Sequence, residues 1–261
     1  MANPVVVDLS HWNNEPDWEM LKTNGTVGVI LKATQGTGYL DNTFTARASA
    51  ARKAGLMVSS YHFLEHGNIQ KQMDWYLSKA NPSVGDRLVI DFEENPNGTD
   101  ATFDELEEAA EYLMSSGEYQ VAVYGSGHLV SSVGSKTSSI LSKTSLWQAR
   151  YSSSEPQVPT SIWPRWDLWQ YTQTGTPLGC VGSTDCNKWN AAAGNIELWF
   201  NFDEGVPDVD PEDKSTVNVS MDITAPQGTS VALHFDVTAP KTSSMVITVN
   251  GETVADVPAI S

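Results

Sequence analysis

The chain has 261 residues, of which 40% are hydrophobic, so it can build one large domain or two ordinary ones around packed cores. The 32 acidic and 15 basic residues give a formal charge of −17, which excludes nonspecific nucleic-acid binding and disfavours an anionic membrane as partner. No apolar run could span a membrane, and no secretory signal is visible at the start of the sequence. Two cysteines exclude a disulfide scaffold and a four-thiolate zinc site, and we expect no metal and no cofactor.

Eight short apolar segments predict β-strands along the first 200 residues. Most of them are apolar at nearly every position, which is typical of strands buried on both faces in a parallel sheet. The predicted strands cover residues 4–8, 27–33, 56–63, 87–92, 120–125, 145–149, 167–171 and 196–200.

Helical patterns stand between the early strands. Residues 42–54 carry apolar side chains at helical spacing and end at Gly55. Residues 102–116 do the same, begin with a capping box formed by Thr102 and Glu105, and are followed by a glycine. After residue 125 the helical signal weakens and the strands come closer together. The order of elements predicts an α/β fold: either a closed β/α barrel, irregular in its last third, or a doubly wound open sheet.

The strand ends favour the barrel, because polar side chains stand where most of the strands finish. In a β/α barrel these ends converge on one mouth, whereas in an open sheet only the ends near a switch point meet. The residues concerned are Asp8, Tyr61, His62, Asp91, Glu93, Tyr124, Gln148 and Gln170.

The composition changes after residue 202. Residues 203–214 are rich in acids and proline and predict a linker. Residues 215–261 alternate apolar and polar side chains, and Asn250-Gly251 is typical of a tight hairpin turn. We therefore expect a large domain over 1–202 and a small antiparallel β module over 215–261. The size of this module suggests a role in targeting or self-association, the latter making a homo-oligomer.

The strongest candidate for chemistry is Asp91-Phe92-Glu93 at the end of the fourth predicted strand. Residues two apart in a strand face the same side, so the two carboxyl groups share a side and Phe92 faces away. A pair of carboxyl groups in different surroundings can supply one protonated acid and one anion, as glycoside hydrolysis requires. Taken alone, such a pair is more often a solvated rim. Asp8 alone is more often a cap, and residues 182–187, which include Asp185, indicate a polar turn.

Aromatic residues in or beside the strands fit a sugar site, because sugar rings stack on aromatic faces. They include Tyr61, Tyr124, Trp147, Trp169 and Tyr171. Aromatic residues in strands are more often part of the core, so at most half of these are expected to touch a ligand.

In combination, several segments resemble the glycoside hydrolase family 25 lysozymes, the Chalaropsis-type muramidases common among phage endolysins. The matching segments run in family order over about 200 residues. They are 6–12 (VVDLSHW), 29–39 (VILKATQGTGY), 60–63 (SYHF), 89–93 (VIDFE), 123–124, 146–147, 168–171 (LWQY) and 184–187 (TDCN).

The resemblance implies an irregular (β/α)5β3 barrel and cleavage of the β-1,4 bond between N-acetylmuramic acid and N-acetylglucosamine in peptidoglycan. It implies that Glu93 is the general acid and that Asp91 assists, by orienting the N-acetyl group or by positioning water. Retention and inversion both fit this arrangement. Asp8 and Asp185 would tune the pair. The implied substrate-binding residues are Tyr61, Tyr124, Trp169, Gln170 and Lys32.

Two other functions share the same barrel and strand ends. One is a glycan-binding barrel without turnover, and the other is a chitinase-like glycosidase. The intact acidic residues favour an active enzyme. The resemblance also suggests that the protein is phage-encoded, made in the host cytoplasm and active on the cell wall.

Overall fold

The computed structural model describes residues 4–201, 245–249 and 252–257. The chain divides into two compact units, Met1–Glu204 and Gly205–Ser261. In the second unit, β10 (Met245–Val249) and β11 (Glu252–Val257) pair antiparallel on either side of the predicted hairpin turn. The predicted linker 203–214 and the earlier strands expected in the C-terminal module lie outside the described residues.

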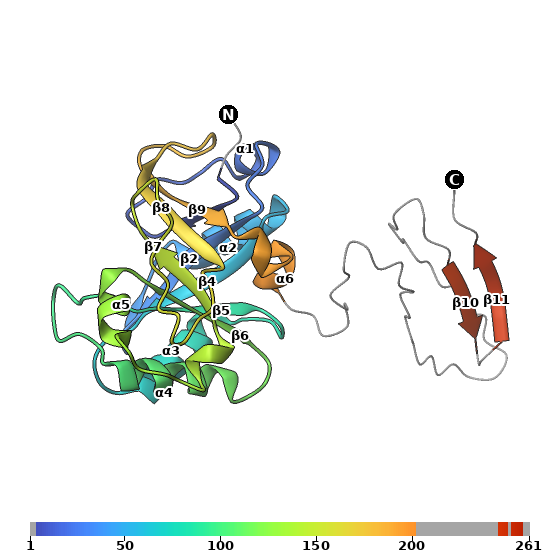
Figure 1. Ribbon diagram of the computed structural model, residues 1–261. Coiled ribbons are helices and arrows are strands. Elements are labelled where there is room, and N and C mark those ends of the chain that lie inside the picture. Colours follow the sequence, from blue (N-terminus) through green and yellow to red (C-terminus); the bar gives the residue numbers. More distant parts are fainter. Residues whose placement is uncertain (1–3, 202–244, 250–251, 258–261) are drawn as a thin grey trace. The chain divides into compact units, whose positions relative to one another are not determined.

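Eight strands of the first unit close into a barrel (Figure 1). β1 pairs parallel with β2 on one side and antiparallel with β9 on the other, which closes the ring. Neighbours from β2 round to β8 are parallel, and β9 runs antiparallel to both of its neighbours. The closed ring confirms the barrel over the open sheet. The strands are β1 (Val6–Leu9), β2 (Gly28–Gln35), β4 (Met57–Phe63), β5 (Arg87–Asp91), β6 (Gln120–Gly125), β7 (Ser145–Ala149), β8 (Leu168–Gly175) and β9 (Thr184–Trp189), with β3 (Tyr39–Leu40) as a short hairpin partner of β2.

Six α-helices of the first unit connect or follow these strands. The predicted helices over 42–54 and 102–116 are confirmed as α2 and α4, and Thr102 and Glu105 form the expected capping box. Gly55 has φ 77° just after α2, a backbone conformation that favours glycine. The helices are α1 (Trp18–Thr23), α2 (Phe44–Lys53), α3 (Ile69–Ala80), α4 (Phe103–Met114), α5 (Gly127–Val133) and α6 (Ile196–Phe200).

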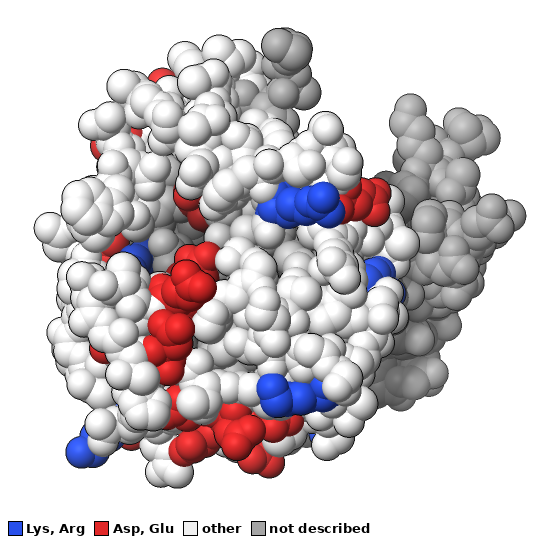
Figure 2. Space-filling view, turned by 60° about the vertical axis from the view of Figure 1, so that its left-hand side comes forward, with Lys and Arg blue, Asp and Glu red and all other residues white. Residues whose placement is uncertain are grey.

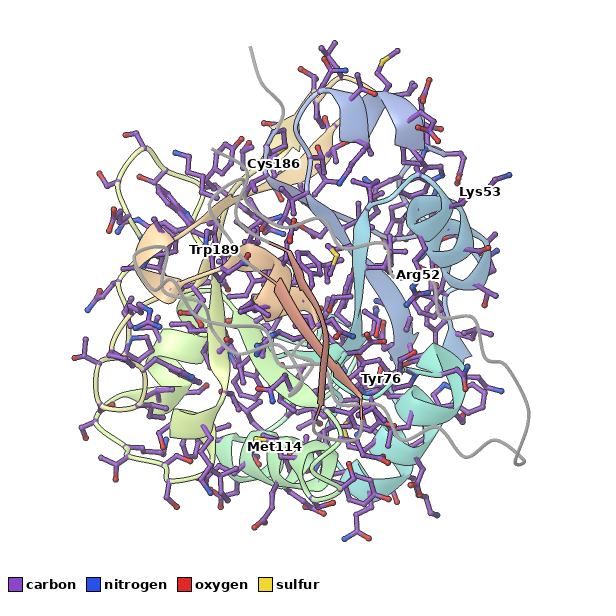
Figure 3. The ribbon with its side chains drawn as sticks, turned by 90° about the vertical axis from the view of Figure 1, so that its right-hand side faces the viewer. Arg52, Lys53, Tyr76, Met114, Cys186 and Trp189 are labelled. Atoms are coloured by element: carbon purple, nitrogen blue, oxygen red, sulfur yellow. The ribbon has the colours of Figure 1, made fainter. Side chains whose placement is uncertain are left out.

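The strands bury both faces, because alternate side chains point into the barrel and out towards the helices. Val7 and Leu9 pack in the outer core, while Val6 packs in the inner one. Tyr76 of α3 is fully buried in the outer layer (Figure 3) and donates a hydrogen bond to the Ser60 carbonyl on β4 at 2.7 Å. This contact ties α3 to the barrel wall.

The eighth barrel strand is not the one predicted. Residues 196–200 form α6, and residues 184–189, which overlap the polar turn indicated over 182–187, form β9. Ile196, Trp199 and Phe200 have helical spacing, and the Asn195 side chain caps the helix by accepting from the Glu197 amide. The sequence of β9 is mostly polar because its inward side chains are the polar groups that line the barrel mouth.

α6 closes one end of the barrel. Phe200 is fully buried in the inner core and lies against Gly28 at the start of β2, where a side chain on residue 28 would overlap its ring. Arg87, at the start of β5, donates to the Trp199 carbonyl and lies over the Trp199 ring. These contacts place α6 at the amino ends of the parallel strands, so the opposite end remains for a site.

The two cysteines are free thiols in the structure. Cys186 is buried on β9, the strand that also carries Trp189 (Figure 3). Its side chain faces away from the barrel interior, on the opposite parity from the site residues of β9.

Candidate active site

Most strands of the barrel bring a polar or aromatic side chain to the end where the parallel strands finish. The side chains share the inward parity of their strands and enclose an open cavity of about 150 Å³. Acidic side chains also gather around a hollow of the molecular surface (Figure 2). The cavity is lined by Asp8, Tyr61, Asp91, Glu93, Tyr124, Trp147, Tyr151, Gln170 and Asp185.

Asp91 and Glu93 share this cavity because strand pairing continues past the end of β5. The Asp91 carbonyl accepts from the Leu64 amide at 3.0 Å, and the Phe92 amide donates to the Tyr124 carbonyl at 2.9 Å. Phe92 is fully buried in the outer core. The prediction that the two carboxyl groups face one side and Phe92 the other is therefore confirmed.

Both carboxyl groups are held away from bulk water, which disfavours their charged forms. Burial raises the pKa of Asp91 well above its ordinary value, and the neighbouring Glu93 raises it further. Burial, then the charges of Asp185 and Glu94, raise the pKa of Glu93, against the opposing effect of Lys32. Asp91 is 5% exposed, and its Oδ1 has no hydrogen-bond partner among the described residues.

Asp8 and Asp185 form a second carboxyl pair across the β1–β9 pairing. The two residues are partners in the antiparallel register, and the charge of Asp185 raises the pKa of Asp8. Burial raises the pKa of Asp8 well above its ordinary value and that of Asp185 to about 6. At neutral pH this pair retains a proton more readily than two isolated aspartates would.

Amide side chains hold the Asp8 carboxylate in place. Gln170 Nε2 donates to both Asp8 oxygens, at 3.0 and 3.1 Å, and Asn187 Nδ2 donates to Oδ2 at 2.8 Å. Asn187 is fully buried, and its own Oδ1 accepts from Trp147 Nε1 at 2.7 Å. Asp8 therefore has a fixed orientation before any ligand arrives.

The hydroxyl groups of two tyrosines bond to the side-chain oxygen of Gln170, while its side-chain nitrogen bonds to Asp8. Tyr124 and Tyr151 each donate to Gln170 Oε1 at 2.9 Å. Tyr151 lies in the segment after β7 and leaves 52% of its surface exposed, so its ring forms part of the cavity rim. Burial raises the pKa of Tyr151 to about 12, and it stays a hydrogen-bond donor at neutral pH.

Lys32 on β2 stands behind the cavity rather than in its lining. It is half-buried, and its Nζ donates to Gln35 Oε1 at 2.8 Å and lies 6.0 Å from the Tyr61 ring centre. Burial lowers the pKa of Lys32, while the neighbouring acids Asp91, Asp41, Glu65 and Glu93 raise it. Its cation favours the charged forms of Asp91 and Glu93.

We expect the substitution Lys32→Met to move the alkaline limb of the pH–activity profile to higher pH. Loss of the cation raises the pKa of Glu93, so a protonated Glu93 persists at higher pH. The profile of kcat/KM against pH measures this shift. Lys32→Arg keeps the charge and serves as the matched control, and an alkaline limb that moves equally in both variants would contradict the electrostatic explanation.

The structure brings together most, but not all, of the residues indicated by the sequence. Asp8, Asp91, Glu93 and Asp185 line one cavity, with Tyr61, Tyr124 and Gln170 beside them. Trp169 does not line it. Its parity on β8 is opposite to that of Gln170, and its indole packs in the outer core and donates to the Arg150 carbonyl at 2.8 Å.

Trp147 and Tyr151 line the cavity without having been assigned to the site from the sequence. The parity of β7 could have identified Trp147, since it pairs with Tyr124 on the neighbouring strand. Tyr151 follows the end of β7, and no local pattern marks it. No group of His, Cys, Asp and Glu suited to hold a metal ion occurs in the part of the chain that the structure describes. None of its helices is long and apolar enough to cross a membrane.

Comparisons with known proteins agree on one family. The profile of the glycosyl hydrolases family 25 matches residues 7–180, which is more than half of the sequence. The chain belongs to this family. Lysozyme M1 of Streptomyces globisporus is 28% identical over 203 residues, covering 73% of this chain and 69% of that protein. The autolytic lysozyme of Clostridium acetobutylicum is 25% identical over 186 residues, covering 70% and 55% respectively.

A solved structure shares the family 25 fold. The bacterial lysozyme from Streptomyces coelicolor superposes with a TM-score of 0.67 at 27% identity, covering 77% of this chain and 97% of that one. The chain is therefore a glycoside hydrolase of the lysozyme class, and the cavity at the carboxyl ends of its strands is its candidate active site.

Proposed function

We propose that this enzyme is an N-acetylmuramidase that cleaves the β-1,4 bond between N-acetylmuramic acid and N-acetylglucosamine in peptidoglycan. The observation that carries the proposal is the Asp91 and Glu93 pair in one cavity: burial raises the pKa of both, the charge of Glu93 adds to it at Asp91, and that of Asp185 adds to it at Glu93. Such surroundings favour a protonated carboxyl group at neutral pH, which is what a general acid requires.

In the proposed reaction, Glu93 donates its proton to the glycosidic oxygen. The bond between this oxygen and C1 of N-acetylmuramic acid breaks, and the leaving sugar takes the proton as its new hydroxyl group. Positive charge develops at C1 and its ring oxygen, and the Asp91 carboxylate favours that charge. Water finally supplies a hydroxyl group to C1 and a proton to the active site. Asp91 assists by orienting the substrate's N-acetyl group or the attacking water.

The remaining cavity residues are assigned to substrate orientation. Asp8 and Asp185 surround the reacting pair with negative charge, and Asp185 raises the pKa of Glu93. Tyr61, Tyr124 and Gln170 offer polar groups at the cavity wall, where sugar hydroxyl groups need partners.

Analysis of the released products tests the proposed bond. Purified peptidoglycan is digested with the full-length protein, and the new reducing ends are identified by borohydride reduction and mass spectrometry. Reducing ends on N-acetylmuramic acid are expected. Reducing ends on N-acetylglucosamine, or release of chitin fragments, would indicate a chitinase-like specificity. No product from several wall types would indicate a glycan-binding barrel without turnover.

We further propose that the enzyme acts on the wall from inside a bacterial cell, as phage endolysins do. The support for this role is the resemblance to that group. Expression in a susceptible host should then cause lysis only after the inner membrane is permeabilised. Lysis without permeabilisation would contradict the role.

The C-terminal unit is proposed to serve wall targeting or self-association. Its separate composition and its net charge of −8 after residue 202 support a function distinct from catalysis. Sedimentation of the full chain and its binding to purified walls test the two roles. A monomer whose wall binding is unchanged by competing C-terminal peptide would contradict both.

A further inference from the structure

Trp12 follows β1, the strand that carries the cavity residue Asp8, and is unusually exposed. Its side chain is 84% exposed, the highest value among the large hydrophobic residues that the structure describes. It lies in the segment after β1, four residues beyond Asp8. The ring of His11 is 4.4 Å from its ring, between centroids, and 5.9 Å from that of Tyr39, which is 40% exposed. An aromatic residue so placed either has no role or binds something outside the fold.

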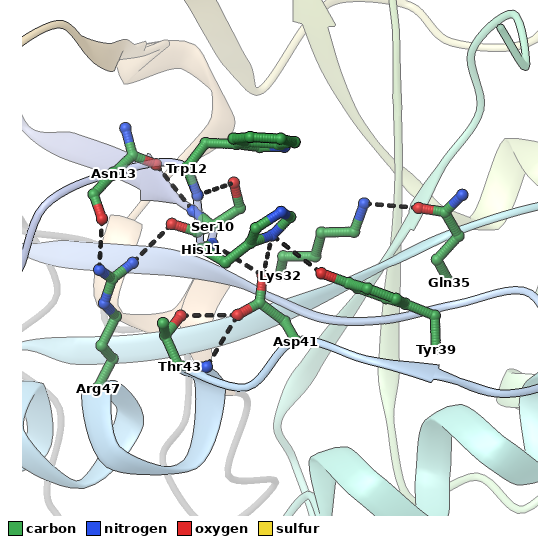
Figure 4. A network of polar contacts seen from close by, with 10 residues as sticks. All are labelled: Ser10, His11, Trp12, Asn13, Lys32, Gln35, Tyr39, Asp41, Thr43 and Arg47. Carbon is green, nitrogen blue, oxygen red and sulfur yellow. Dashed lines mark hydrogen bonds and ion pairs between the residues drawn. The ribbon is translucent and has the colours of Figure 1, made fainter. Parts of the chain in front are cut away.

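The backbone around Trp12 is fixed by a buried arginine. Arg47 of α2 is 3% exposed, and it donates to the carbonyl oxygens of Ser10 and Asn13 at 2.7 Å each (Figure 4). The Asn13 side chain accepts from the Ser10 amide at 2.9 Å, and the Asn13 amide donates to the Ser10 carbonyl at 3.0 Å. Trp12 is therefore presented to solvent by a well-anchored turn.

The neighbouring rings are held by one buried carboxylate. Asp41 Oδ2 accepts from the His11 amide at 2.8 Å and lies 3.1 Å from His11 Nδ1. The Tyr39 hydroxyl lies 2.9 Å from the same His11 nitrogen, and His11 stands between Trp12 and Tyr39 (Figure 4). Asp41 Oδ1 accepts from the Thr43 amide and hydroxyl. This network sets the orientation of the rings before a ligand binds.

A series of contacts connects these rings to the catalytic cavity. Lys32 Nζ lies 5.5 Å from the Tyr39 ring centre and 6.0 Å from that of Tyr61, which lines the cavity. Tyr39 and the cavity residue Tyr61 therefore share Lys32 as a neighbour. The cations nearby are engaged, since Lys32 donates to Gln35 and Arg47 is buried, so the surface suits a neutral ligand.

We propose that Trp12 and Tyr39 form a distal sugar subsite, which binds a ring of the glycan strand away from the cleaved bond. The apolar C–H face of a sugar stacks on the Trp12 indole, and the Tyr39 hydroxyl provides a polar partner for a substituent. The proposal rests on the proposed function, because it takes the glycan strand as substrate. The subsite strengthens binding of long strands and leaves the chemical step unchanged.

The test compares peptide-free glycan strands of two lengths, prepared from purified peptidoglycan as long strands and as tetrasaccharides. For Trp12→Ala we expect KM for long strands to rise about tenfold. This corresponds to a loss of about 1.4 kcal/mol of binding free energy, the contribution of one stacked ring. We expect kcat for long strands and both constants for tetrasaccharides to stay at the wild-type values. Trp12→Phe keeps a ring and should restore most of the affinity.

A matched control is Val84→Ala, since Val84 is 71% exposed and precedes the amino end of β5. It should change neither KM nor kcat. An unchanged KM for long strands in Trp12→Ala would overturn the proposal, and so would equal losses for both lengths.

Failure of the proposed function is recognised separately, as a wild-type protein that cleaves neither substrate. The subsite is then tested by equilibrium binding of the same long strands. A tenfold weaker binding by Trp12→Ala supports the subsite, and wild-type binding overturns it.

Discussion

Replacement of Glu93 by Gln is expected to lower kcat on peptidoglycan by about three orders of magnitude, within the range that general acid catalysis contributes. Gln has nearly the same shape as Glu but carries no transferable proton, so the glycosidic oxygen would leave as an alkoxide. Glu93 is partly buried beside charges that raise its pKa, and its removal should not weaken the fold. The loss of turbidity of a cell-wall suspension measures the effect, with thermal unfolding as a check on the fold.

Glu94 offers a matched control for this experiment. It is the next residue along the chain, and its side chain is 81% exposed, 4.0 Å from His128 Nδ1. Glu94→Gln should retain activity within about twofold, since the charge of an exposed side chain is screened by water, and burial and Asp185, the larger causes of the raised Glu93 pKa, stay in place. Equal losses for both variants would show that the general acid has been assigned to the wrong carboxyl group.

The second large effect is expected for Asp91→Asn, which should lower kcat by about 10²- to 10³-fold, a range typical of a lost electrostatic contact in the transition state. Asp91 lines the cavity, and its Oδ1 is buried without a partner in the described part of the chain. An amide keeps the shape but cannot match the charge. Steady-state kinetics on peptidoglycan should show the loss in kcat rather than in KM.

The same variant is expected to be more stable than wild type at neutral pH. The folded protein raises the pKa of Asp91, so it binds this proton more tightly than the unfolded chain does. This contribution to stability is complete below the unfolded pKa of about 3.9 and is lost as pH rises through the folded pKa. Asp91→Asn removes that dependence. In thermal unfolding, the variant should have a higher melting temperature than wild type at pH 7 and the same melting temperature at pH 3. A lower melting temperature of the variant at pH 7 would contradict this account.

Much of the barrel follows from local patterns. Residues 28–31 and 88–90 are apolar throughout and residues 6–9 are apolar except at Asp8, because strands between a filled interior and a helical layer bury both faces. α4 carries its start signal in the Thr102–Glu105 capping box. Such features need no information from distant parts of the chain.

The last strand could not be identified in this way. β9 places Asp185 and Asn187 in the barrel mouth, where their partners are Asp8 and Trp147 from strands far away in the sequence. A strand whose inward positions are polar has the composition of a turn. In contrast, four of residues 196–200 are apolar because α6 seals the other end of the barrel, and so short an apolar segment does not distinguish a strand from a helix.

The site itself was predicted where strand parity determines it. Asp8, Asp91 and Gln170 all stand at inward positions near strand ends, so the barrel brings them together. The same parity argument, applied to β8, places Trp169 outside. Tyr151 depends on the path of an irregular segment after β7, and only the structure shows that its hydroxyl reaches Gln170.

The central claim is that Glu93 gives the proton that releases the leaving sugar. Its most direct test compares two substrates of Glu93→Gln: the natural glycan, and a dinitrophenyl glycoside whose leaving group departs without a proton. The account predicts a loss of about a thousandfold on the glycan and less than about tenfold on the dinitrophenyl glycoside. Equal losses on the two substrates would contradict it, since the role of Glu93 would then lie in binding or in folding rather than in proton transfer.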